Sequence, residues 1–250
     1  MPVDDSDEIR LDHLTWPELD RLGRLGWDTV LLPLGSTEQH GPHLPLGTDA
    51  VIATEVALRA ARRLGRTLVA PVLPIGCSDE HRDFPGMLSV DHETLTALIL
   101  DVCRRLLERD LRPVVFSAHG GNGRALQRAA GIMGPRGLVI RPELEFSPAA
   151  FLATLGVGVT RSGVHAGLAE TSMMLASDPS LVREERYQTG YVGDLEAIWK
   201  VLTTRGLRAA TPNGVLGDPS GSTAERGEAC LDAWADSVAW LIRRWRESGA

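Results

Sequence analysis

The sequence predicts an α/β fold in which helices cover a mostly parallel sheet. Apolar strand-like segments alternate with amphipathic helix-like segments from residue 15 to residue 142, an order typical of repeated strand–helix–strand units. The 250 residues are enough to bury a large core, and 43% of them are hydrophobic. Neither a repeat nor a linker interrupts the chain, so we expect a single domain over residues 1–250.

The first elements are a helix, a buried strand and a second helix. Thr15 and Glu18 have the spacing of a capping box, which predicts a helix that ends near residue 25. The run 28–35 is apolar without alternation, as expected for a strand that is buried on both faces. Apolar residues at helical spacing predict the second helix over 49–64, and Asp49 is a candidate for its N-cap.

The same alternation continues through the middle of the chain. We expect strands over 66–73, 113–117 and 138–142, and helices over 91–109 and 123–132.

The C-terminal part is less regular. Residues 146–162 show no clear period. A helix is expected from Glu170 to residue 176, and a long amphipathic helix from 223 to 247.

The composition excludes several classes of protein. The chain has 33 acidic and 26 basic residues and a net charge of −7, whereas nucleic-acid binders show a basic excess or stripe. No apolar run approaches the roughly 20 residues of a membrane span, and the acidic N-terminus is unlike a signal peptide. The three cysteines form no CxxC pair. We therefore expect a cytoplasmic protein with neither a nucleic-acid nor a membrane partner.

The first candidate for a functional site is the segment 35–49, which follows the first strand. Glu38 and His40 are two residues apart, and in extended chain such side chains point to the same side. Asp49 comes after a loop rich in Gly and Pro that can fold the chain back. Oxygen and nitrogen ligands without a thiolate suit Zn²⁺, Mn²⁺ or Fe(II).

The second candidate is His119, which directly follows a later strand. In open α/β sheets, sites form outside the carboxyl ends of the strands, and parallel strands have these ends at one edge. We therefore expect His119 to lie close to Glu38. Gly120 and Gly121 permit a sharp turn and a close approach of the backbone.

The third candidate is the pair His165 and Glu170. A spacing of five places helical positions about 140° apart, so we expect His165 in a loop and Glu170 in the first turns of the following helix. Singly, His40 reads as a loop residue, Asp49 as a helix cap and Glu170 as a charge that complements a helix dipole. Together with His119, which needs polar partners at a buried strand end, they indicate a metal site.

Other polar residues leave alternatives open. His81 either lines the mouth of the site or belongs to a polar loop, and Cys77 is expected to be a small buried residue. The remaining histidines, expected in loops or at the surface, are His13, His43 and His92.

Three segments, residues 34–49, 119–122 and 165–172, resemble the creatininase (creatinine amidohydrolase) family and appear in that family's order. The similarity covers roughly residues 25–230. The resemblance implies a three-layer α/β/α sandwich, a centre of two divalent metal ions and a homo-oligomer, commonly a hexamer.

The resemblance also implies a set of metal ligands. Glu38, Asp49 and His119 would hold one ion, and His40 and Asp49 would serve the second, with Asp49 as the bridge. A hydroxide that bridges the two ions would then attack the amide carbonyl of the substrate.

One position departs from the creatinine-hydrolysing members, which have a further carboxylate where this chain has Gly121. Glu170 is the natural replacement, and the departure argues against creatinine as the substrate. His165 matches the catalytic histidine of the family. We expect it to protonate the leaving nitrogen, because the unperturbed pKa of histidine lies near the working pH.

Two loop motifs, residues 80–86 and 212–219, are similar to the creatininase-family peptidases of the mycofactocin pathway. Those peptidases release the C-terminal Val-Tyr dipeptide from a modified precursor peptide, so this resemblance implies such a peptide as the partner. His81 and the backbone N–H groups of Gly120 and Gly121 are expected to contact the substrate.

Two other functions remain open from the sequence. The first is hydrolysis of a cyclic amide or a formamide by the same chemistry. The second is a non-catalytic metal-binding scaffold, although a structural metal site needs no additional histidine such as His165.

Overall fold

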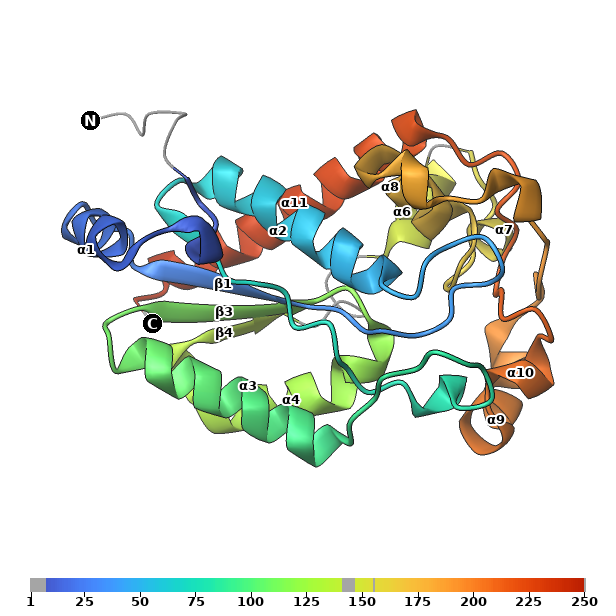
Figure 1. Ribbon diagram of the computed structural model, residues 1–250, viewed down its shortest axis with the longest axis horizontal. Coiled ribbons are helices and arrows are strands. Elements are labelled where there is room, and N and C mark those ends of the chain that lie inside the picture. Colours follow the sequence, from blue (N-terminus) through green and yellow to red (C-terminus); the bar gives the residue numbers. More distant parts are fainter. Residues whose placement is uncertain (1–7, 141–146, 155, 250) are drawn as a thin grey trace.

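The computed structural model describes residues 8–140, 147–154 and 156–249, and it has the expected three-layer α/β/α architecture (Figure 1). Its sheet has the strand order β2-β1-β3-β4, and every neighbouring pair is parallel. The strands are β1 (Thr29–Leu34), β2 (Thr67–Val69), β3 (Arg112–Ser117) and β4 (Leu138–Ile140). Because the strands are parallel, their carboxyl ends share one edge.

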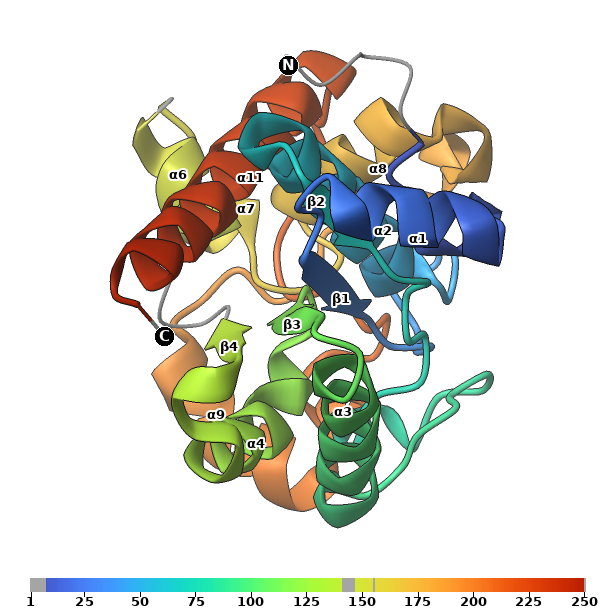
Figure 2. The same ribbon diagram turned by 90° about the vertical axis from the view of Figure 1, so that its left-hand side faces the viewer.

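Helices cover both faces of this sheet (Figures 1 and 2). On one face lie α2 (Thr48–Leu64), α8 (Leu168–Ser177) and α11 (Ala224–Glu247). On the other face lie α3 (His92–Leu107) and α4 (Gly123–Met133).

The central strand β1 contributes to the core on both sides. Leu31 belongs to the apolar cluster shared with α2 and α11, whereas Val30 and Leu32 belong to the cluster shared with α3 and α4. Burial on both faces explains why this strand reads as apolar without alternation.

The starts of the helices agree with their sequence signals. Thr15 caps α1 (Trp16–Arg24), and its N–H donates to Glu18 Oε2 at 2.7 Å, which confirms the capping box. Thr223 caps α11, and its hydroxyl accepts from the Arg226 N–H.

Three expectations about the elements need correction. The N-cap of α2 is Gly47, so the prediction of Asp49 as the cap is wrong, and Asp49 instead lies in the first turn with its side chain buried. The strand expected over 66–73 is regular only in β2, since Pro71 has no N–H to offer a ladder. The segment 146–162 contains two helices that the sequence pattern did not predict, α6 (Pro148–Thr154) and α7 (Val159–Ser162).

The carboxyl edge of the sheet is covered by loops and by two further helices, α9 (Leu195–Arg205) and α10 (Leu207–Ala210) (Figure 1). The last two positions of the strand expected over 138–142 lie outside the described residues. Among the helices of the described ranges, none is long and apolar enough to cross a bilayer.

Candidate metal centre

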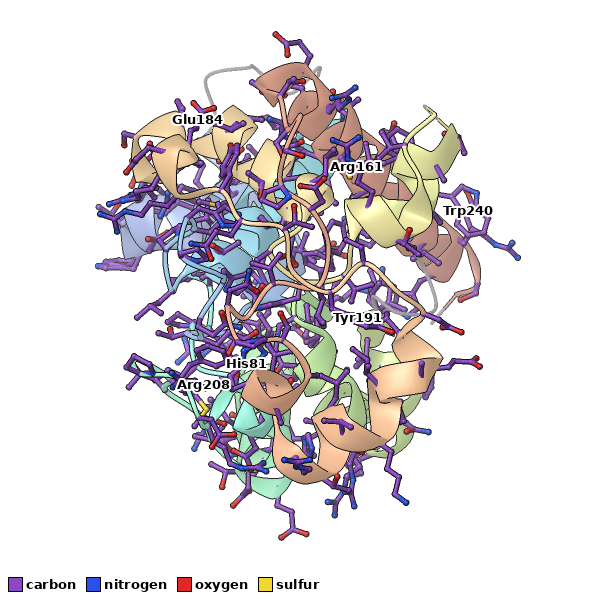
Figure 3. All side chains as sticks on the ribbon, turned by 90° about the vertical axis from the view of Figure 1, so that its right-hand side faces the viewer. His81, Arg161, Glu184, Tyr191, Arg208 and Trp240 are labelled. Atoms are coloured by element: carbon purple, nitrogen blue, oxygen red, sulfur yellow. The ribbon has the colours of Figure 1, made fainter. Side chains whose placement is uncertain are left out.

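The predicted site residues come together at the carboxyl edge of the sheet. Glu38 and His40 follow β1, and His119 follows β3, whose last residue pairs with the last residue of β1. Figure 3 looks onto this edge. Asp49 reaches it from α2 and Glu170 from the first turn of α8. All five side chains are buried or half-buried.

The first group consists of Glu38, Asp49 and His119, whose ligand atoms lie within 4.8 Å of one another. His119 Nε2 is 3.3 Å from Glu38 Oε2, and His119 Nδ1 is 3.2 Å from Asp49 Oδ2. Two carboxylates and an imidazole are a donor set that a divalent transition metal accepts.

The second group consists of His40, Asp49 and Glu170. His40 Nε2 is 3.0 Å from Asp49 Oδ1 and 3.8 Å from Glu170 Oε2. Asp49 is common to both groups and turns one oxygen toward each. This geometry is what a carboxylate bridge between two metal ions requires.

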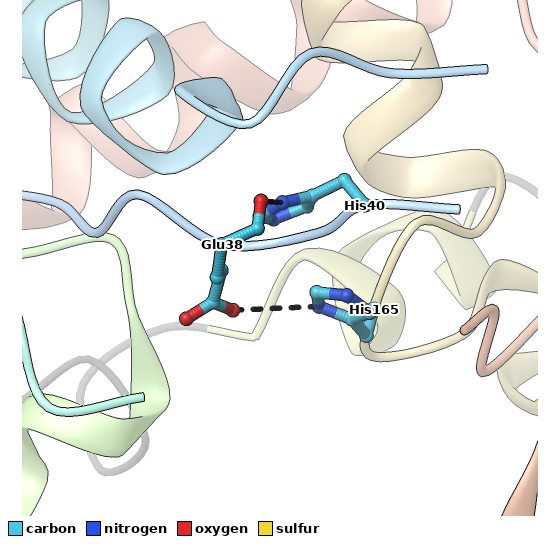
Figure 4. A group of neighbouring side chains, drawn as sticks. All are labelled: Glu38, His40 and His165. Atoms are coloured by element: carbon cyan, nitrogen blue, oxygen red, sulfur yellow. Dashed lines mark hydrogen bonds and ion pairs between the residues drawn. The ribbon is translucent and has the colours of Figure 1, made fainter. Parts of the chain in front are cut away.

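A third group adds His165, which lies in the loop before α8 as expected (Figure 4). Its Nδ1 is 3.9 Å from Glu38 Oε1, and its ring centroid is 4.3 Å from that of His40. His165 therefore borders both metal-ligand groups.

Orphaned oxygen atoms indicate that these groups fit a cation. Within the described part of the chain, both carboxylate oxygens of Glu38 and Oδ2 of Asp49 are buried without a well-formed hydrogen bond, and their nearest polar neighbours are rings of His81 and His119 at 3.0–3.3 Å. Burying charged oxygens without well-formed hydrogen bonds costs free energy, and a bound cation offsets that cost.

The outer nitrogens of the histidines support the same conclusion. His40 Nδ1 is 3.2 Å from the backbone oxygen of Glu38, and His119 Nε2 is 2.8 Å from that of Cys77. Metal-binding histidines commonly donate their outer N–H to such an acceptor, which fixes the tautomer and aims the other nitrogen at the metal.

The carboxylates and histidines of the site perturb one another electrostatically. Burial opposes the charge on His40 and His119, but Asp49 raises the pKa of His40 to about 9, and Glu38 raises the pKa of His119 to about 10. Burial raises the pKa of Glu170 to about 7. Perturbed titratable groups in one cluster are typical of functional sites.

His165 differs from the other two histidines. Burial and the positive charge of His40 hold its pKa well below the usual value. Its ring is therefore neutral near pH 7, and its part in protonating the leaving nitrogen stays a prediction.

The predicted substrate-binding residues lie beside the metal-ligand groups. His81, from the 3₁₀ segment Asp79–His81, is only 3% exposed, and its Nε2 lies 3.0 Å from Glu38 Oε1. Gly120 and Gly121 belong to the 3₁₀ turn after His119. Their contacts with a substrate stay a prediction.

The surroundings of Gly121 leave no room for a side chain. A Cβ at this position would lie 2.2 Å from the Cys77 oxygen and 2.4 Å from His119 Nε2, and Glu80 Oε1 would be 2.9 Å away. The carboxylate of Glu80 thus occupies part of the space that a side chain at position 121 would fill. Only the tertiary structure shows this contact.

Three buried residues beside the site were not identified from the sequence. His43 lies in a loop, one of its two expected places, but its side chain is buried rather than at the surface, and Nε2 lies 3.0 Å from Thr171 Oγ1. Asn122 accepts from the Cys77 N–H and donates to the backbone oxygen of Gly35. Gln39 contacts two of the site histidines.

The chain matches known proteins over nearly its whole length. The Creatininase family model, described as "Creatinine amidohydrolase", matches residues 12–242. A Mycobacterium ulcerans protein named "Mycofactocin precursor peptide peptidase" is 37% identical over 227 residues, which cover 88% of this chain and 86% of the relative. The Pseudomonas putida "Creatinine amidohydrolase" is 30% identical over 257 residues, covering 95% and 97%.

Solved creatininase structures also have the same fold as this chain. A creatininase mutant solved in a Zn-Zn form superposes with a TM-score of 0.76 at 26% identity and covers 96% of this chain and 98% of its own. The family match, the sequence identities and the α/β/α fold agree, and the chain therefore belongs to the creatininase family and is a hydrolase of amide C–N bonds.

Proposed function

We propose that this chain is a single metal-dependent hydrolase domain that releases the C-terminal Val-Tyr dipeptide from a modified mycofactocin precursor peptide. The observation that carries the proposal is Asp49, which faces both ligand groups at the same strand edge. The choice of a peptide substrate is supported by the 37% identity to a relative with that name. It is also supported by Gly121, which leaves no room for the carboxylate of the creatinine-hydrolysing enzymes.

In this proposal the centre holds two divalent ions, Zn²⁺, Fe(II) or Mn²⁺. Glu38 and His119 would hold one ion, His40 and Glu170 the other, and Asp49 both. Such ions, when bound, lower the pKa of a coordinated water and polarise a carbonyl oxygen.

His165 would carry the proton that the reaction must move. Its neutral ring can take a proton from the attacking water at Nδ1, the nitrogen that lies 3.9 Å from Glu38 Oε1. It can then give that proton to the leaving nitrogen, which otherwise departs as a poor leaving group. His81 and the N–H groups of Gly120 and Gly121 complete the proposed substrate contacts.

The assembly and the compartment are part of the proposal as well. The family resemblance is the basis for a homo-oligomer, commonly a hexamer. A reducing cytoplasm is supported by the cysteines Cys77, Cys103 and Cys230, which are all buried and free.

The test is to incubate the metal-loaded protein with a modified precursor peptide that ends in Val-Tyr and to follow dipeptide release by mass spectrometry. Parallel reactions contain creatinine or a formamide in place of the peptide. We expect dipeptide release, its loss after chelation and its return when metal is added. Formation of creatine or formate without dipeptide release would contradict the proposed substrate, and a metal-loaded protein inert on all three would favour a non-catalytic scaffold.

A further inference from the structure

The side chain of Gln39 lies between two histidines of the site. It is 6% exposed, and its Nε2 is 3.1 Å from His81 Nδ1 and 2.9 Å from His165 Nε2. The same nitrogen is 3.1 Å from the backbone oxygen of Gly214. One amide group thus meets three polar atoms from three segments that are distant in the sequence.

The orientation of this amide follows from its other end. Gln39 Oε1 accepts a hydrogen bond from the Gly41 N–H at 2.8 Å, so the nitrogen must face the histidines. Gly214 holds the amide in place. Its φ of +77° is a conformation that favours glycine, and a Cβ there would lie 2.0 Å from Gln39 Oε1. Glycine therefore permits both this backbone conformation and the close packing against the Gln39 amide.

Counting hydrogens decides which histidine nitrogens carry protons. The amide has two hydrogens for three neighbours. His165 Nε2 also lies 2.8 Å from the backbone oxygen of Gln39, a buried acceptor to which it can donate. The arrangement that pairs every donor and acceptor has His165 Nε2–H donating to that oxygen, and the two amide hydrogens going to His81 Nδ1 and the Gly214 oxygen. The approach of Gln39 Nε2 to His165 Nε2 at 2.9 Å is then a packing contact between two donors.

This count fixes the functional nitrogen of each ring. Because the Gln39 amide nitrogen donates to His81 Nδ1, the ring hydrogen of His81 lies on Nε2, which is 3.0 Å from Glu38 Oε1. In His165, Nε2 carries the hydrogen, so the lone pair on Nδ1 faces Glu38 and the metal-ligand groups.

We propose that Gln39 is a positioning residue that sets the tautomers of both histidines, His81 through its side chain and His165 through its backbone oxygen. It thereby supports the carboxylate of Glu38 and prepares His165 to accept a proton. The proposal also gives a role to the two loop motifs, since residues 80–86 contain His81 and residues 212–219 contain Gly214. The tautomer assignment is independent of the proposed function, and only the expected effect of Gln39 on turnover rests on it.

The test is nitrogen NMR of the zinc-loaded protein labelled with ¹⁵N at histidine. The ring signals are assigned with His81→Gln and His165→Gln. In the native sequence we expect His81 and His165 each to carry their proton on Nε2. A proton on Nδ1 of either ring in the unmodified protein would overturn the proposal, whatever the behaviour of any variant.

Gln39→Glu provides the second measurement, because it keeps the shape of the side chain but offers His81 only acceptors. We expect Nδ1 of His81 to gain a proton, while His165 keeps Nε2–H because its backbone acceptor is unchanged. Gln127→Glu, an exposed substitution on α4, makes the same change of charge and should leave both rings as they are. An unaltered His81 in Gln39→Glu would contradict the proposal.

The effect on turnover separates this proposal from the proposed function. With the peptide substrate we expect Gln39→Glu to lower kcat about 10- to 100-fold, as is usual when a partner of a metal ligand is altered. Full activity in Gln39→Glu would overturn the positioning role. If the unmodified protein released no dipeptide but showed the expected tautomers, the proposed substrate would fail and the tautomer assignment would stand.

Discussion

Asp49 Oδ1 lies 3.0 Å from His40 Nε2, and the other oxygen of the same carboxylate faces His119 at 3.2 Å. A single side chain thus belongs to both metal-ligand groups. We expect Asp49→Ala to remove metal from both, because each group loses one of its three donors. The measurement is the metal content after dialysis, by elemental analysis.

Glu55→Ala is the matched control for Asp49→Ala, since Glu55 lies on the same helix, pairs with Arg59 and belongs to none of the metal-ligand groups of the described residues. It should retain the metal content of the unmodified protein. An Asp49→Ala protein that keeps one tightly bound ion would contradict the bridge.

His165→Ala should separate metal binding from turnover. Neither of the groups that contain Asp49 includes His165, so we expect both ions to remain. We expect kcat to fall about 10²- to 10⁴-fold, the usual contribution of a positioned acid–base group. Unchanged kcat at equal metal content would show that His165 moves no proton in the slow step.

Much of the site was predictable because the sequence signals are local and the fold rule is general. The apolar run of β1 and the strand before His119 place Glu38 and His119 at one sheet edge, and this follows from parallel pairing alone. The position of Glu170 in the first turn of α8 was likewise predictable from its spacing to His165.

The remaining features depend on contacts between distant parts of the chain. Gln39 meets residues 42 and 126 positions away, and neither contact has a period or a spacing that a sequence can show. The contact of Glu80 with the space beside Gly121 is of the same kind. Helix periodicity also failed for α6 and α7, which are too short to display a repeating apolar face.

Gly121→Ala should weaken metal binding although it adds only one methyl group. The new Cβ would meet the backbone oxygen of Cys77 at 2.2 Å and the His119 ring at 2.4 Å, so His119 must move. We expect metal affinity to fall about 10- to 100-fold, as when the support of a ligand is disturbed. Competition with a chromogenic chelator measures the change.

Gly120→Ala is the control for metal binding, since a Cβ there meets no atom within 4 Å among the described residues. It should keep the native metal affinity. Equal affinities for the two variants would show that His119 is not held by the packing around Gly121.

Asn122→Ala should destabilise the metal-free protein. The Asn122 amide accepts from the Cys77 N–H at 2.9 Å and donates to the Gly35 oxygen and to Ser117 Oγ, each at 3.1 Å. It thus joins the ends of β1 and β3 to the loop that precedes His81. Truncation leaves these buried groups unpaired, and we expect a loss of about 3 kcal/mol in the free energy of unfolding, at about 1–3 kcal/mol per group without full additivity.

Urea unfolding of the chelator-treated protein measures the effect of Asn122→Ala without a contribution from metal binding. A change below about 0.5 kcal/mol, the scatter of ordinary surface substitutions, would show that the three hydrogen bonds do not hold the loops together.

Metal binding should release protons near pH 7. The pKa values of about 9 for His40 and about 10 for His119 mean that both rings are protonated in the metal-free protein at this pH. A ring nitrogen binds a metal only after it loses its proton. Zinc must therefore displace protons, and the apparent affinity should rise with pH until both rings are neutral in the free protein, near pH 10.

Calorimetric titration with zinc in buffers of different ionisation enthalpy gives the number of protons released. His13→Gln is the control, because His13 is exposed and belongs to none of the metal-ligand groups, so its removal should leave that number unchanged. His40→Gln should lower the number, since one protonated ligand has been removed. If the heat of binding did not depend on the buffer, His40 and His119 would already be neutral before the metal arrives, and the carboxylates would not hold protons on them.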